Sequence, residues 1–135
     1  MVALALTATL LRADPAYDFA NRFGQMASRS ENHNEIYSAA LCQAMNDHGF
    51  KASMVSFQWG FEYGRQGQYW GTFVAFQDAQ GHYWAKGSTD VHPRQLPAQS
   101  AQWANYYCGA EIWVKEQAIT PAPETSRPVV AAAMP

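Results

Sequence analysis

The fold is decided by residues 51–90, which read KASMVSFQWGFEYGRQGQYWGTFVAFQDAQGHYWAKGSTD. Three of the five tryptophans, Trp59, Trp70 and Trp84, lie in this stretch. Ser53 to Gly60 is a β-branched and aromatic run without proline, which is typical of a strand. Thr72 to Gln77 has apolar residues on both faces of its alternation, which predicts a central strand covered on both sides.

A hairpin is predicted at the end of this central strand. The sequence Asp78-Ala79-Gln80-Gly81 supplies turn residues, and Gly81 is able to take the left-handed conformation that closes the turn. His82 to Lys86 then returns beside the central strand. The whole stretch therefore predicts consecutive antiparallel strands.

Helices are predicted before and after this stretch of the sequence. Asp14 and Pro15 fit a helix start, as cap and first helical residue. A longer helix, Asn34 to His48, is followed by Gly49 as a left-handed cap. Its predicted buried stripe has helical spacing and consists of Ile36, Ala40, Leu41, Ala44 and Met45. Ala98 to Tyr107 predicts a short helix with Trp103, Tyr106 and Tyr107 inward, and Ala110 to Lys115 a last strand.

The length of 135 residues favours one domain. We expect an α+β fold over residues 1–119, with an antiparallel sheet of four to five strands packed on a central helix. The alternative is a ferredoxin-like α/β sandwich, since the order strand, helix, strand, strand, helix, strand also suits that fold. Residues 120–135 contain four prolines and no periodicity, which indicates a Pro/Ala-rich tail. Val2 to Leu10 fits a strand or a helix equally well.

Composition and charge exclude some classes of binding partner. The net charge of −2 gives no electrostatic reason to expect binding to nucleic acid. Phe73, Val74 and Phe76 share half of the RNA-recognition signature, but the preceding basic half is missing. The apolar start, MVALALTATLL, has no basic residue before it and is too short to span a membrane. We therefore expect a soluble protein that contacts neither nucleic acid nor membrane, with a cytoplasmic location as the default.

Cys42, His82 and Asp90 follow one another in an order that carries a family resemblance. With the run GHYWAKGSTD, the segment from Asn34 to Asp90 resembles papain-like and transglutaminase-like enzymes, in which a cysteine opens a helix and the histidine and acid lie on following strands. The resemblance implies a cysteine hydrolase or amidase that uses these three residues.

The chain departs from that pattern at two places. Cys42 lies about two turns inside its helix, and Asn34 occupies the position where the nucleophile would open it. The strand position of the histidine falls near Trp70 to Thr72, where there is none. A degenerate member of the family is therefore the second interpretation. We expect Cys42 to be a packed core thiol that is not paired with Cys108.

Metal binding is not expected. The histidines and cysteines show no CxxC, HExxH or HxH spacing. His33 and His48 flank opposite ends of one predicted helix, ~20 Å apart at 1.5 Å per residue, so they cannot share a metal. We therefore expect neither a metal nor a cofactor.

A cluster of aromatic residues surrounds the glycine-rich segment from Gly60 to Gly71. Aromatic side chains of this kind are common hot spots of protein interfaces. We expect a small binding or inhibitory protein whose partner is another protein, with no oligomeric state implied. The alternatives are the cysteine hydrolase and a structural assembly subunit whose tail reaches a neighbour. The predicted binding residues are Trp59, Phe61, Tyr63, Arg65, Tyr69 and Trp70.

Overall fold

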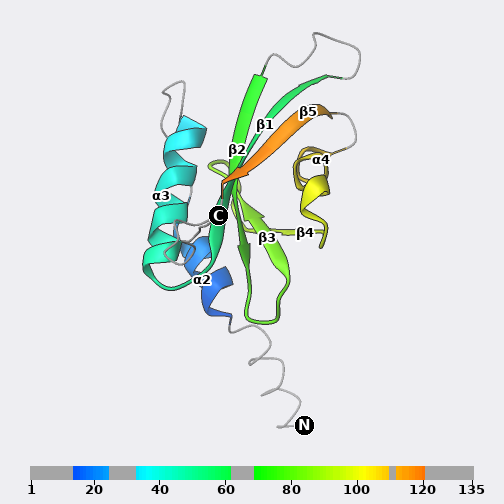
Figure 1. Cartoon of the computed structure of the whole chain (residues 1–135). Helices are drawn as coiled ribbons and strands as arrows, with labels where there is room; N and C mark the ends of the chain where they lie inside the picture. The colour runs from blue at the N-terminus through cyan, green and yellow to red at the C-terminus, as the bar shows by residue number, and fades with distance from the viewer. Residues whose placement is uncertain (1–13, 25–32, 62–68, 110–111, 121–135) are drawn as a thin grey trace, which may run out of the picture.

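The computed structural model describes residues 14–24, 33–61, 69–109 and 112–120 (Figure 1). These residues form a single-domain α+β fold, as the sequence predicted. Residues 1–13, 62–68 and 121–135 lie outside the described ranges, and so do the predictions for the first apolar run and for the tail. The elements are α2 (Pro15–Arg22), α3 (His33–Asp47), β1 (Ala52–Phe61), β2 (Tyr69–Gln77), β3 (Tyr83–Lys86), β4 (Arg94–Leu96), η1 (Ser100–Gln102), α4 (Trp103–Cys108) and β5 (Ile112–Thr120).

The sheet has five strands in the order β4-β3-β2-β1-β5. Every neighbouring pair is antiparallel, and β1 pairs with β2 from Ala52↔Phe76 to Trp59↔Tyr69. The strands from β1 to β4 therefore lie side by side in chain order. This order excludes the ferredoxin-like alternative, because a split βαβ arrangement interleaves its strands.

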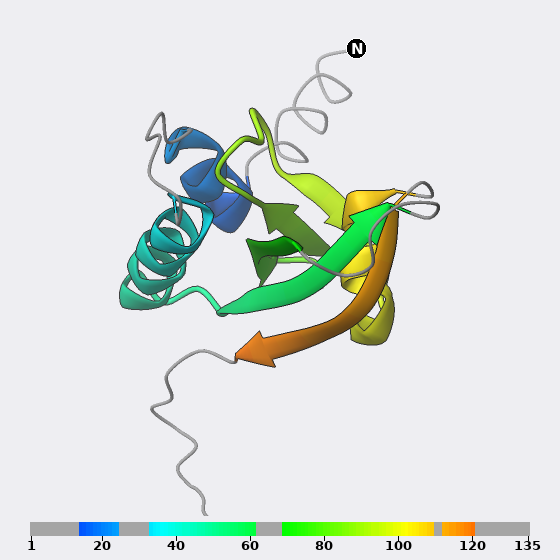
Figure 2. The same cartoon turned by 90° about the horizontal axis from the view of Figure 1, so that it is seen from above.

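The central strand β2 is buried on both faces. Val74 and Phe76 pack on the same core as Leu41 and Met45 of α3. Phe73 packs in a second core on the opposite face, which Val55, Phe57, Ala75, Ala85, Leu96, Trp103 and Ala104 complete. Figure 2 shows α2 and α3 on one side of the sheet and α4 on the other. The prediction of a central strand covered on both sides is confirmed.

The turn between β2 and β3 is held by Asp78. Its Oδ1 accepts hydrogen bonds from the backbone N–H groups of Gln80 and His82, both at 2.9 Å. Its Oδ2 accepts a hydrogen bond from the indole N–H of Trp84 at 2.9 Å. Gly81 has φ +92°, a left-handed conformation that side chains disfavour. The predicted hairpin is confirmed, together with the role of its glycine.

The two larger helices begin and end as the sequence indicated, but α3 buries a different face. Asp14 caps α2 by accepting the N–H of Tyr17 at 3.0 Å, and Gly49 ends α3 with φ +89°. The predicted stripe is wrong at Ile36, which is 48% exposed, and at Ala40, which is also exposed. The buried face instead consists of Tyr37, Ser38, Leu41, Cys42 and Met45, because Leu41 and Met45 pack in one core with Val74 and Phe76 of β2.

A buried lysine ties three elements together. The Lys86 ammonium on β3 donates to the Gly24 carbonyl after α2 at 2.7 Å and to the Tyr37 hydroxyl of α3 at 2.6 Å. The Tyr37 hydroxyl in turn donates to the Gly24 carbonyl at 2.5 Å. Burial lowers the pKa of Lys86 and raises the pKa of Tyr37 to about 12. The network joins α3 and the end of α2 to strand β3 of the sheet.

The C-terminal elements cover the second face. Trp103 is buried and its indole N–H donates to the Pro97 carbonyl at 2.8 Å. Tyr106 is 62% exposed, so the prediction that it points inward is wrong. The Gln117 side chain accepts the Ala104 N–H at 2.9 Å, which joins α4 to β5. Antiparallel pairing with β1 extends β5 to Thr120, beyond the predicted strand end at Lys115.

Truncation of one buried and one exposed residue of α3 tests which face of the helix is buried. Leu41→Ala leaves a cavity in a fully buried site, so the free energy of unfolding should fall by about 2–5 kcal/mol. Ile36→Ala removes a half-exposed side chain and should cost below about 1 kcal/mol. Urea unfolding of the two variants measures the difference. Equal losses would mean that α3 packs through another face.

Candidate functional site

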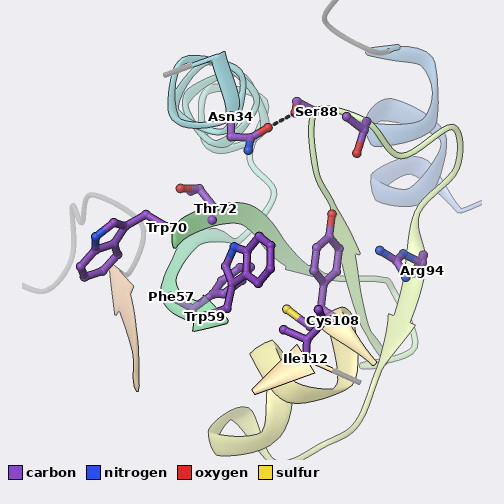
Figure 3. Close-up of a pocket in the computed structure, with 12 residues that line it drawn as sticks. Asn34, Phe57, Trp59, Trp70, Thr72, Ser88, Arg94, Cys108 and Ile112 are labelled. Atoms are coloured by element: carbon purple, nitrogen blue, oxygen red, sulfur yellow. Dashed lines mark hydrogen bonds between the residues drawn. The ribbon is translucent and has the colours of Figure 1, made fainter. Parts of the chain in front are cut away.

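A pocket of about 300 Å³ opens where the first turn of α3, β1, β2 and the end of α4 converge (Figure 3). Segments that are far apart in the chain therefore contribute to one site. Its lining combines aromatic, hydroxyl and amide side chains with one guanidinium. The lining residues are Asn34, Phe57, Trp59, Trp70, Gly71, Thr72, Ser88, Thr89, Arg94, Tyr107, Cys108 and Ile112.

The polar side of the pocket is built on Asn34, in the first turn of α3. The buried Ser88 hydroxyl donates a short hydrogen bond to Asn34 Oδ1, drawn as the dashed line in Figure 3. Thr72, on the face of β2 that also carries Val74, lines the pocket beside them. The amide oxygen of Asn34 accepts this hydrogen bond from Ser88. The other polar atom of the Asn34 side chain is Nδ2, which is a donor.

A second polar group surrounds Asp90. Its Oδ2 accepts hydrogen bonds from the Tyr107 hydroxyl at 2.6 Å and from the Gly87 N–H at 2.7 Å. Its Oδ1 lies 3.3 Å from Nη2 of Arg94, whose guanidinium lies 4.2 Å from the centre of the Tyr107 ring. Burial, together with Asp90, raises the pKa of Tyr107, so the phenol stays protonated as a donor. A side chain at Gly87 would collide with the Tyr107 hydroxyl.

Aromatic side chains form the opposite side of the pocket. Trp59 and Tyr69 stack with ring centres 4.8 Å apart. Tyr69 is 46% exposed and Trp70 is 62% exposed. The ring of Phe57 packs on Phe73 beneath them. Of the predicted binding residues, Trp59 and Trp70 thus line the pocket and Tyr69 stacks on Trp59, whereas Tyr63, Arg65 and the Phe61 side chain lie outside what the structure describes.

Cys42, His82 and Asp90 lie in different surroundings. Cys42 is buried between α3 and the sheet, with Sγ 3.5 Å from the Ala52 carbonyl oxygen. Burial raises the pKa of this thiol, which disfavours a reactive thiolate. His82 is exposed, and its Nδ1 lies 3.6 Å from Asp78 Oδ2. The described polar contacts of Cys42, His82 and Asp90 join none of them to another.

The sequence pointed to only part of the pocket. Asn34 and the stretch from Trp70 to Thr72 were singled out from the sequence, because the papain-like pattern places its nucleophile and its histidine at these positions. Ser88, Arg94 and Tyr107 carry no motif, because the pairing of β3 with β4 and the packing of α4 bring them together. Only the three-dimensional structure supplies that information.

Two other histidines, His48 and His92, contact neighbouring groups of the protein, and the side chain of His33 lies outside what the structure describes. Nδ1 of His48 lies 2.9 Å from the Ala44 carbonyl oxygen, and Nδ1 of His92 lies 2.8 Å from Asn21 Oδ1. Within the described ranges, no group of three or more His, Cys, Asp or Glu residues is placed to hold a metal ion. No helix among the same residues has both the length and the apolar character needed to cross a membrane.

The environment of Cys42 predicts an unreactive thiol. In a Cys108→Ser variant, native protein near neutral pH should resist a thiol reagent, and the same protein in urea should react with one equivalent. The reason is that Cys42 is buried and its pKa is raised. Labelling followed by mass spectrometry gives the readout. Rapid stoichiometric labelling of the native variant would contradict the burial of this thiol.

No family model, curated protein or solved structure matches this chain.

Proposed function

We propose that this protein is a small binding protein that takes a polypeptide segment of another protein. The segment lies in the pocket beside Asn34 and against the aromatic residues Trp59 and Trp70. The observation that carries the proposal is the 62% exposure of Trp70, a large aromatic side chain that lines a pocket with convergent polar groups.

The physical reason is that aromatic and polar residues contribute differently to binding in such a site. Large aromatic rings supply most of the binding free energy once a partner covers them. A few fixed polar groups orient the ligand and penalise those that leave them unpaired. Asn34, Ser88 and Arg94 are such groups, since hydrogen bonds or an ion pair hold each of them within the structure.

The resemblance to papain-like proteins supports the same proposal. Asn34 and Thr72, at the positions expected for the nucleophile and near the histidine, both line the pocket. Neither side chain serves as a thiol nucleophile or an imidazole base. The chain would then be a degenerate member of that family that keeps the groove and binds without hydrolysis. The burial of Cys42 favours binding over the cysteine hydrolase.

A display experiment tests the binding function. A library of linear 12-residue peptides, joined to the carrier at their C-termini, is selected against the immobilised protein. Selected peptides should lose about 2 kcal/mol of binding free energy, roughly 30-fold in affinity, with Trp70→Ala. Tyr106→Ala is the matched control, because this residue is equally exposed at 62% and does not line the pocket.

Two results separate binding from folding. Urea unfolding of Trp70→Ala should match that of the unchanged protein, since the side chain is mostly exposed. If selection yields no peptide whose affinity depends on Trp70, the pocket is not the binding surface and the proposed function fails.

A further inference from the structure

We propose that the pocket is specific for an acidic polypeptide segment, and that Arg94 binds the carboxylate of an aspartate or glutamate side chain of the partner. This inference rests on the proposed function and names the chemistry of its ligand. It begins from the charges that line the pocket.

Among the described residues that line the pocket, Arg94 is the one with a charged side chain. Apart from Gly71, the other lining residues within the described ranges carry aromatic, aliphatic, hydroxyl, amide or thiol side chains, and none of these is a carboxylate. A basic ligand would meet the like charge of the Arg94 guanidinium and would find no carboxylate for itself among these lining residues, which costs free energy. An acidic ligand instead gains charge-assisted hydrogen bonds.

The guanidinium of Arg94 is held in place yet remains accessible. Its plane packs on the Tyr107 ring at 4.2 Å, which fixes its orientation. The Arg94 side chain is 52% exposed, and its ion pair with Asp90 has a single contact of 3.3 Å. A guanidinium carries five N–H donors, so this contact uses only part of them.

Asp90 positions Arg94 without saturating it. The shorter contacts of Asp90 are those with the Tyr107 hydroxyl at 2.6 Å and the Gly87 N–H at 2.7 Å. These two donors take one carboxylate oxygen, and the longer contact to Arg94 uses the other. Asp90 is therefore a positioning residue for Arg94, and the ligand completes the coordination of the guanidinium.

The start of α3 adds a second source of positive potential. Asn34 lies in the first turn of this 15-residue helix and lines the pocket. The N-terminal end of a helix carries a partial positive charge that favours anions. Asn34 Nδ2 offers a further donor on the same side of the pocket.

Other classes of ligand fit this lining less well. A neutral saccharide presents many hydroxyl donors, and the lining that the structure describes has no carboxylate to accept them. A nucleic acid carries a charge on every phosphate, whereas the described lining of the pocket has one cation and the chain has a net charge of −2. A single side-chain carboxylate matches a single guanidinium.

The test uses peptides selected by display, synthesised with amidated C-termini so that side chains carry the only carboxylates. The acidic residue of each peptide is replaced by its amide, Glu→Gln or Asp→Asn. The unchanged protein should bind the acidic form at least about 10-fold more tightly. Arg94→Gln should reduce this discrimination to within about 2-fold, and Arg94→Lys should retain part of it.

Arg22→Gln is the control for charge, because Arg22 lies at the end of α2 and does not line the pocket. This variant should discriminate as the unchanged protein does. Selected peptides that depend on Trp70 but show no acidic residue, or discrimination that survives Arg94→Gln, would overturn the inference and leave the binding function intact. Competition by a 12-residue oligothymidylate at the affinity of the acidic peptide would overturn it in favour of a nucleic acid.

Discussion

Burial of β2 on both faces is the constraint on which the rest of the structure depends. Phe73 faces one core, and Val74 and Phe76 face the other, so each side of the sheet needs a helical cover. The helix α3 supplies one cover, and α4 supplies the other. Because both covers pack on the same strand, their ends meet the sheet around Thr72, where the pocket lies. The site is thus a consequence of how the core is closed.

The Lys86 network sets where α3 ends up on its face of the sheet. An ammonium that is fully buried must be satisfied by hydrogen bonds, and Tyr37 and the Gly24 carbonyl supply them. This arrangement places the first turn of α3, one turn before Tyr37, next to Ser88 at the end of β3. The polar side of the pocket therefore depends on a buried charge that does not line it.

Much of the fold was accessible from the sequence because local chemistry determines it. The alternation of Thr72 to Gln77, the Asp14 cap and the left-handed glycines at Gly49 and Gly81 are local signals, and the structure agrees with each. The buried face of α3 was not accessible, since Ile36 and Tyr37 start two adjacent apolar stripes and only contact with the sheet selects one. The pairing of Arg94 with Asp90 and Tyr107 depends on α4 packing, which no local pattern encodes.

The central claim is that a partner binds in the pocket at one end of β2 and contacts Trp59 and Trp70. The most direct measurement is the indole N–H region of a nitrogen-15 NMR spectrum during titration with a selected peptide. The signals of Trp59 and Trp70 should move, because both residues line the pocket. Those of Trp84 and Trp103 should stay fixed, because their indole N–H groups bind Asp78 and the Pro97 carbonyl within the fold. Movement of Trp84 and Trp103 with Trp59 and Trp70 unchanged would contradict the account.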